Sequence, residues 1–109
     1  MASLNSRMAL ACDPEGIPSV DRPGHFALLN RLFGELSLGH VTSPDGYSYR
    51  FDPSAFELIA SFVKNERKCC PFLNFLIEVR ALGAPVWLHI TGPEGTRDFL
   101  DLELPSVRT

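Results

Sequence analysis

The decisive stretch of this sequence is residues 65–72, which read NERKCCPF. A helical pattern leads into the stretch and a strand pattern leads out of it, so the chain is expected to turn here. Because the residue before a proline avoids the α region, the helix should end near Lys68 and Cys70 should be extended. Two of the three cysteines, Cys69 and Cys70, lie at this junction. We therefore expect that any chemistry this chain supports takes place at this corner.

The segments on either side of the corner have clear sequence signals. Asp52 can cap the helix that leads into it, and Pro53 suits the first helical position. The predicted buried stripe of this helix consists of Phe56, Ile59, Ala60 and Val63. Beyond the corner, residues 73–80 alternate between apolar and polar side chains, and residues 86–91 do the same. These two segments predict an antiparallel hairpin.

The rest of the chain adds a strand, a helix, a second hairpin and a short last helix. Residues 7–12 predict a first strand. Residues 22–35 predict an amphipathic helix, with apolar positions at Phe26, Leu29, Phe33 and Leu36. Residues 36–42 and 47–51 predict a hairpin around the turn SPDG at 43–46, in which proline and glycine suit the turn dihedrals. A last helix is expected to begin at residues 91–94 and to stop at Pro105.

This element order, β-α-β-β-α-β-β-α, predicts the α+β class. A chain of 109 residues has the size of one domain, so we expect a single domain over residues 1–109. The economical arrangement is a two-layer sandwich, with a mostly antiparallel sheet of about five strands and the helices on one face.

Composition limits the classes of partner that this protein is expected to bind. The net charge is −3 and basic residues do not cluster, which argues against non-specific nucleic-acid binding. No apolar run is long enough to cross a bilayer, and the first residues lack the apolar region of a signal peptide. We therefore expect a cytoplasmic protein with no membrane partner. In a reducing compartment, three cysteines indicate free thiols, metal ligands or redox groups rather than a disulfide framework.

The adjacent thiols indicate a site for a soft metal ion. Neighbouring Cα atoms are about 3.8 Å apart, which is too close for a relaxed disulfide between Cys69 and Cys70. In extended chain the two side chains would also point to opposite sides, so a third sulfur is needed, and Cys12 is the only candidate. Thiolates favour Cu(I), Zn(II) and Hg(II). The absence of C-x-x-C and of any four-ligand spacing argues against zinc. The alternative is that both cysteines simply pack the corner.

Other polar residues favour structural interpretations. His89 shares a strand face with Trp87 and is expected to be a partly exposed sheet residue. His25 and His40 are expected to be structural, although a Cys–His pair using His89 or His25 stays open. Glu66, next to the thiols, is expected to be a solvated helix residue.

Two motifs resemble those of a family of small, largely uncharacterised bacterial proteins. The first is ERKCCPFLNF at residues 66–75, and the second is WLHITGPEG at residues 87–95. The SPDG turn and the pair Ala11-Cys12 have counterparts in that family, although the Pro- and Gly-rich segment after Cys12 is longer here. Members are often found near heavy-metal resistance functions, especially mercury resistance. The resemblance thus implies a heavy-metal role and points to the same three sulfurs.

Three hypotheses follow. In the leading one, Cys12, Cys69 and Cys70 bind a soft metal ion such as Hg(II), Cu(I) or Zn(II), with Arg67 as an electrostatic aid. In the second, the protein is a thiol redox or transfer enzyme with Cys69 as the nucleophile. In the third, it is a binding module or homodimer whose interface is the sheet face with Leu76, Trp87 and His89.

Overall fold

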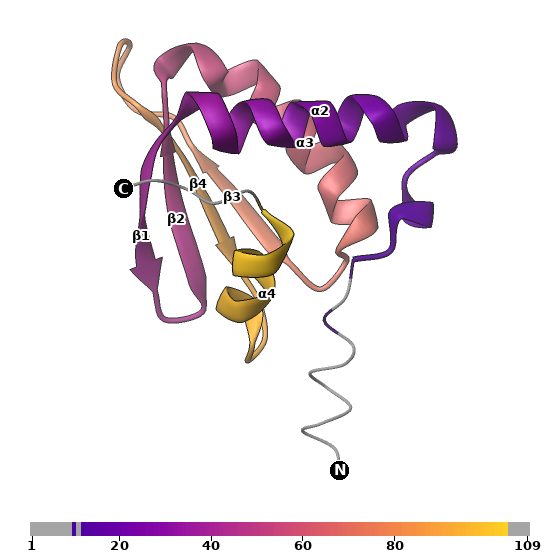
Figure 1. The fold of residues 1–109 in the computed structure, drawn as a ribbon. Helices are drawn as coiled ribbons and strands as arrows, with labels where there is room; N and C mark the ends of the chain where they lie inside the picture. The colour runs from indigo at the N-terminus through magenta and orange to yellow at the C-terminus, as the bar shows by residue number, and fades with distance from the viewer. Residues whose placement is uncertain (1–9, 11, 105–109) are drawn as a thin grey trace.

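A computed structural model describes residue 10 and residues 12–104 and has the predicted α+β class. Within these residues the sheet has four strands, all paired antiparallel, in the order β1-β2-β4-β3 (Figure 1). The strands are β1 (Ser37–Ser43), β2 (Gly46–Phe51), β3 (Asn74–Glu78) and β4 (Val86–Thr91). The α-helices are α2 (Arg22–Arg31), α3 (Phe56–Cys69) and α4 (Thr96–Glu103). Short helical turns precede α2 at η1 (Pro14–Gly16) and η2 (Ser19–Asp21), and η4 (Pro53–Ala55) precedes α3.

The expected count of five strands is wrong for the described part of the chain. Most of the predicted first strand, residues 7–12, lies outside the described residues. Leu10 and Cys12 are described and belong to no strand. Both predicted hairpins are confirmed, since β1 pairs with β2 and β3 pairs with β4. Gly46 is required at the start of β2, because a Cβ there would collide with the Ile90 carbonyl of the neighbouring strand.

The helices and one face of the sheet share a single core. Alternate residues of β2 and β4 point into it, and helices α2, α3 and α4 contribute its other side. The ring of Phe33 lies at the centre, with edge contacts to Tyr49, Phe51 and Phe62 at centroid distances of 5.1, 5.3 and 5.3 Å. Among the described residues, no helix covers the other face of the sheet (Figure 1).

The predicted helices are present, but the buried stripe assigned to α3 is only partly confirmed, by the buried Ile59 and the partly buried Val63. Its buried residues are Ile59, Phe62, Glu66 and Cys69, whereas Phe56 and Ala60 are exposed. The observed buried stripe has regular helical spacing, but one of its members is the carboxylate of Glu66. A pattern of apolar residues alone therefore does not identify it. The helix reaches Cys69, one residue beyond its predicted end. Cys70 leaves the helix with φ −123° and ψ 74°, which is outside the extended region that the sequence predicts.

The other two helices differ less from expectation. The segment after α2 continues as a π-helical turn, η3 (Leu32–Leu36), so the predicted helical extent is confirmed. Phe26 on α2 is 38% exposed, however, and His25 beside it is buried. In α4, Leu100 is buried, and Leu104 after it is buried too. None of the described helices is both long and apolar enough to cross a bilayer.

Candidate metal and thiol site

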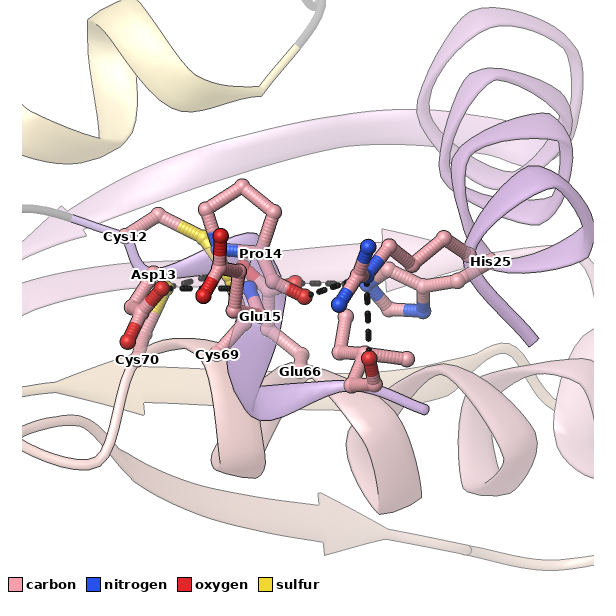
Figure 2. The surroundings of a disulfide bond; sticks show 10 residues. Cys12, Asp13, Pro14, Glu15, His25, Glu66, Cys69 and Cys70 are labelled. Atoms are coloured by element: carbon pink, nitrogen blue, oxygen red, sulfur yellow. Dashed lines mark hydrogen bonds and ion pairs between the residues drawn. A yellow bond between two sulfur atoms is a disulfide. The ribbon is translucent and has the colours of Figure 1, made fainter. Parts of the chain in front are cut away.

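The three cysteines meet at the end of α3 (Figure 2). Cys12 and Cys69 form a disulfide across a sequence separation of 57, with their Cα atoms 5.2 Å apart, and Cys70 is a free, buried thiol. The predicted approach of Cys12 to the pair is therefore confirmed. The composition favours free thiols, metal ligands or redox groups over a disulfide framework. The structure differs in this one disulfide, because the fold brings two Cα atoms to the separation that relaxed disulfides require.

The backbone of residues 13–17 holds Cys12 against the end of α3. The Asp13 amide donates a hydrogen bond to the Cys69 carbonyl at 2.9 Å, satisfying one of the unpaired carbonyls of the last helical turn. Gly16 approaches the Lys68 carbonyl so closely that a Cβ would collide with it. Ile17 is fully buried and anchors the far end of this segment. Gly16 and the buried Ile17 thus fix the position of Cys12, although Cys12 itself lies in no helix or strand.

Arg22 at the start of α2 holds the same segment from the other side. Its Nε donates to the Pro14 carbonyl at 2.9 Å and to the Ile17 carbonyl at 3.0 Å. The Asp13 carboxylate accepts from the Glu15 amide and caps the η1 turn. The segment is therefore tied to α2 and α3, and the position of Cys12 depends on both helices.

The change of backbone conformation at the corner explains how two adjacent cysteines serve one site. Cys69 is the last residue of α3, and the Cys70 amide still donates to the Glu66 carbonyl at 2.7 Å. Cys70 itself has φ −123° and ψ 74°. Because one residue is helical and the next is not, their sulfurs do not point to opposite sides as they would in a strand. Both sulfurs of the pair therefore lie close to the Cys12 sulfur, as the leading hypothesis requires.

A buried pair of polar side chains adjoins the free thiol. Glu66 and His25 are 1% and 2% exposed, and the His25 Nε2 and Glu66 Oε1 atoms are 2.8 Å apart. The His25 ring stacks on Phe62 with centroids 5.5 Å apart. The thiol of Cys70 donates to the other Glu66 oxygen at 3.4 Å. The expectation that Glu66 is solvated is wrong, and its spacing from Ile59, Phe62 and Cys69 is the signal that could have found it. His25, which was expected to be structural, is a buried partner of Glu66.

Burial and negative charge control the electrostatics of this site. Burial raises the pKa of the Cys70 thiol well above its ordinary value, and the Glu66 carboxylate raises that pKa further. Burial likewise raises the pKa of Glu103, with a contribution from Glu66 that His25 partly offsets. Arg67 is exposed on α3 and is not among the groups that set the Cys70 pKa. Its predicted electrostatic role at the site stays a prediction.

A fourth potential ligand comes from α4. The sulfurs of Cys12, Cys69 and Cys70 and a carboxylate oxygen of Glu103 all lie within 4.8 Å of one another. Cys69 and Cys70 are buried, whereas Cys12 and Glu103 are partly exposed, so the site is reached from their side. Sequence reasoning missed Glu103, because nothing in the pattern of α4 shows that its last residue faces the corner after α3.

The residues of the third hypothesis, the binding surface, lie on the face of the sheet that no described helix covers. Leu76 is 63% exposed there, in register with His89, and Trp87 is partly buried with the Arg80 guanidinium 5.4 Å from its ring centroid. His89 lies within hydrogen-bond distance of Ser48 and Glu78, at 2.7 and 2.9 Å. His89 is thus a satisfied sheet residue, as expected, and it lies apart from the sulfurs.

Comparisons with protein families, with curated proteins and with solved structures found no match. The resemblance to heavy-metal-associated bacterial proteins therefore stays a prediction.

Proposed function

We propose that the reduced protein binds one soft heavy-metal ion, best Hg(II), through the thiolates of Cys12, Cys69 and Cys70. The observation that carries this proposal is the meeting of a distant sulfur with an adjacent pair within 4.8 Å. Three sulfurs that close can contact one ion together, and thiolate is the ligand type that the softest cations prefer.

Binding requires the disulfide to be opened first. Two equivalents of a monothiol reduce the Cys12–Cys69 bond, giving two protein thiols and one disulfide of the reductant. A divalent ion then replaces the thiol protons, and three protons are released when all three sulfurs bind. The disulfide and the bound ion use the same two sulfurs, so oxidation of the protein would release the metal.

Burial and exposure give the three sulfurs different tasks. Cys69 and Cys70 are buried, which shields a bound ion from competing thiols. Cys12 is partly exposed, so an incoming thiol of a donor or acceptor can reach the ion on that side. This arrangement suits a protein that buffers the ion or passes it on by thiolate exchange.

The test is a titration of the reduced protein with Hg(II), followed by thiolate-to-metal charge-transfer absorption and by proton release. We expect saturation at one ion per chain with three protons released. Cys12→Ser, Cys69→Ser and Cys70→Ser should each reduce the release to two protons. The disulfide form, with only Cys70 free, is the matched control and should bind Hg(II) no better than a simple monothiol. Saturation with one proton released, or equal binding by the disulfide form, would contradict the proposal.

The disulfide itself favours a second candidate function, thiol–disulfide exchange. Cys69 is fully buried, so exchange would begin with attack of an external thiolate on the Cys12 sulfur, with Cys69 as the leaving thiolate. Cys69→Ser should then trap a stable mixed disulfide on Cys12 when incubated with oxidised glutathione. Equal trapping on Cys70 would argue against this route, because its buried thiol is a poor nucleophile.

A further inference from the structure

A partly buried carboxylate beside the three sulfurs is not used by the function proposed above. Glu103 is the last residue of α4, and its oxygen lies within 4.8 Å of all three sulfur atoms. Its carboxylate belongs to none of the ion pairs among the described residues. Glu66 nearby is different, because it already pairs with His25 at 2.8 Å. Unlike Glu66, Glu103 thus has no cationic partner among the described residues.

We propose that Glu103 is the fourth ligand of this site, which then holds a four-coordinate ion such as Zn(II) through three thiolates and one carboxylate oxygen. This inference rests on the proposed function, since it needs the same three sulfurs in the reduced state. It extends the range of ions from the softest to borderline ones.

The chemistry of the ligand set supports this assignment. Structural Zn(II) sites take four ligands in tetrahedral geometry, and cysteine sulfur and carboxylate oxygen both belong to their usual donors. The sequence shows no four ligands at a spacing typical of zinc sites. The fold supplies the fourth ligand from α4, while Cys12 comes from the N-terminal segment and the pair from the end of α3.

The position of Glu103 on α4 links metal binding to the placement of that helix. Leu100 and Leu104, on either side of Glu103 in sequence, are buried in the core. The Leu104 amide donates to the Leu100 carbonyl at 3.0 Å, which closes the last turn of the helix around Glu103. The core thus holds the carboxylate near the sulfurs before any ion arrives, and little ordering is required on binding.

A carboxylate oxygen should matter unequally for different metals. Zn(II) accepts oxygen donors, whereas Hg(II) is softer and gains little from them beside three thiolates. Glu103→Gln should therefore weaken Zn(II) binding by at least about ten-fold, the lower bound seen when groups around a metal are removed. Hg(II) binding by the same variant should change less than two-fold, which also shows that the thiol site is intact.

The experiment measures Zn(II) and Hg(II) affinities of the reduced protein by competition with chelators of known affinity. Co(II) serves as a coloured substitute for Zn(II), and its visible bands report which ligands surround the ion. The control is Asp98→Asn, which removes an exposed carboxylate of the same helix and should leave both affinities and the Co(II) bands unchanged. The Co(II) bands should shift in Glu103→Gln, because water replaces the carboxylate.

The outcomes separate this inference from the function on which it rests. If the reduced protein binds neither ion better than a monothiol, the proposed function fails. If it binds Hg(II) through three thiolates but Glu103→Gln keeps its Zn(II) affinity and Co(II) bands, only the role of Glu103 is overturned. An equal loss of both ions in Glu103→Gln would overturn it as well, since Glu103 would then act on the fold rather than as a ligand.

Discussion

Reduction of the Cys12–Cys69 disulfide should lower the stability of the fold by a large, calculable amount. The bond closes a loop with a sequence separation of 57. In the chain-entropy treatment, a loop of that length gives roughly 14 cal/mol/K, or about 4 kcal/mol at 25 °C. That is a large share of the 5–15 kcal/mol by which small domains are typically stable. The reduced protein should therefore be folded but easily unfolded.

The assays are urea unfolding and thermal unfolding of the protein with and without a dithiol. We expect a lower midpoint in dithiol and, at an unfolding entropy of about 2.1 cal/mol/K per residue, a fall in Tm of roughly 15–20 °C. The double variant Cys12→Ser/Cys69→Ser should resemble the reduced protein and be insensitive to dithiol, whereas Cys70→Ser should respond as the wild type does.

Metal binding should return part of the lost stability. An ion that binds only the folded, reduced chain, at a free concentration one hundred times its Kd, adds about 2.7 kcal/mol. An unchanged midpoint on reduction would refute the reasoning that places this disulfide in the folded state. A reduced protein that Hg(II) destabilises would refute the idea that the folded state presents the thiols to the ion.

Three further predictions address the surroundings of the sulfurs. Gly16→Ala should destabilise the protein by about 1–3 kcal/mol and make the disulfide easier to reduce with glutathione, because the new Cβ collides with the Lys68 carbonyl. Gly24→Ala is the control, since a Cβ at Gly24 has no neighbour within 4 Å. Equal effects of the two substitutions would contradict the account. His25→Ala should lower the free energy of unfolding in urea by about 3–5 kcal/mol, because it leaves the buried Glu66 carboxylate unpaired. Adding Glu66→Gln should recover part of that loss. Purely additive losses would show that the two residues do not interact. The pKa of Cys70 is raised on folding, so the contribution of its thiol to stability is complete below the unfolded thiol pKa of about 8.5. That contribution is lost as pH rises above this unfolded pKa, by up to about 1.4 kcal/mol per pH unit. The free energy of unfolding of the disulfide form should fall in this way from pH 7 to 10 relative to Cys70→Ser, and identical pH profiles would contradict the burial of that thiol.

The regular elements could be predicted because their signals are local. Alternation in residues 86–91 and the SPDG turn were enough to place the hairpins, since side-chain period and turn chemistry depend on neighbours in sequence. The stripe of α3 was misplaced because Glu66 occupies a core position, and a carboxylate is buried only when a partner such as His25 reaches it. That partner comes from another helix, so its presence is a tertiary fact that local periodicity does not contain.

The site could be predicted only in part, because its residues come from segments that are far apart in sequence. Chemistry alone selected Cys12 as the partner of the adjacent pair, and the fold confirms their proximity. The disulfide was not expected, because pairing depends on the distance between two Cα atoms far apart in sequence. Glu103 stayed hidden, since its place beside the sulfurs depends on how Leu100 and Leu104 seat α4 in the core.

The most direct test of the metal proposal is competition for Hg(II) between the reduced protein and glutathione, with Cys12→Ser measured beside the wild type. If the distant sulfur completes one site with the pair, the wild type should hold Hg(II) at least about one hundred-fold more tightly than a single thiol, because tethered ligands act at high effective concentration. Cys12→Ser should lose most of that advantage. Equal retention of Hg(II) by the wild type and by Cys12→Ser would contradict the account, since the sulfur that the fold brings back to the end of α3 would then contribute nothing to binding.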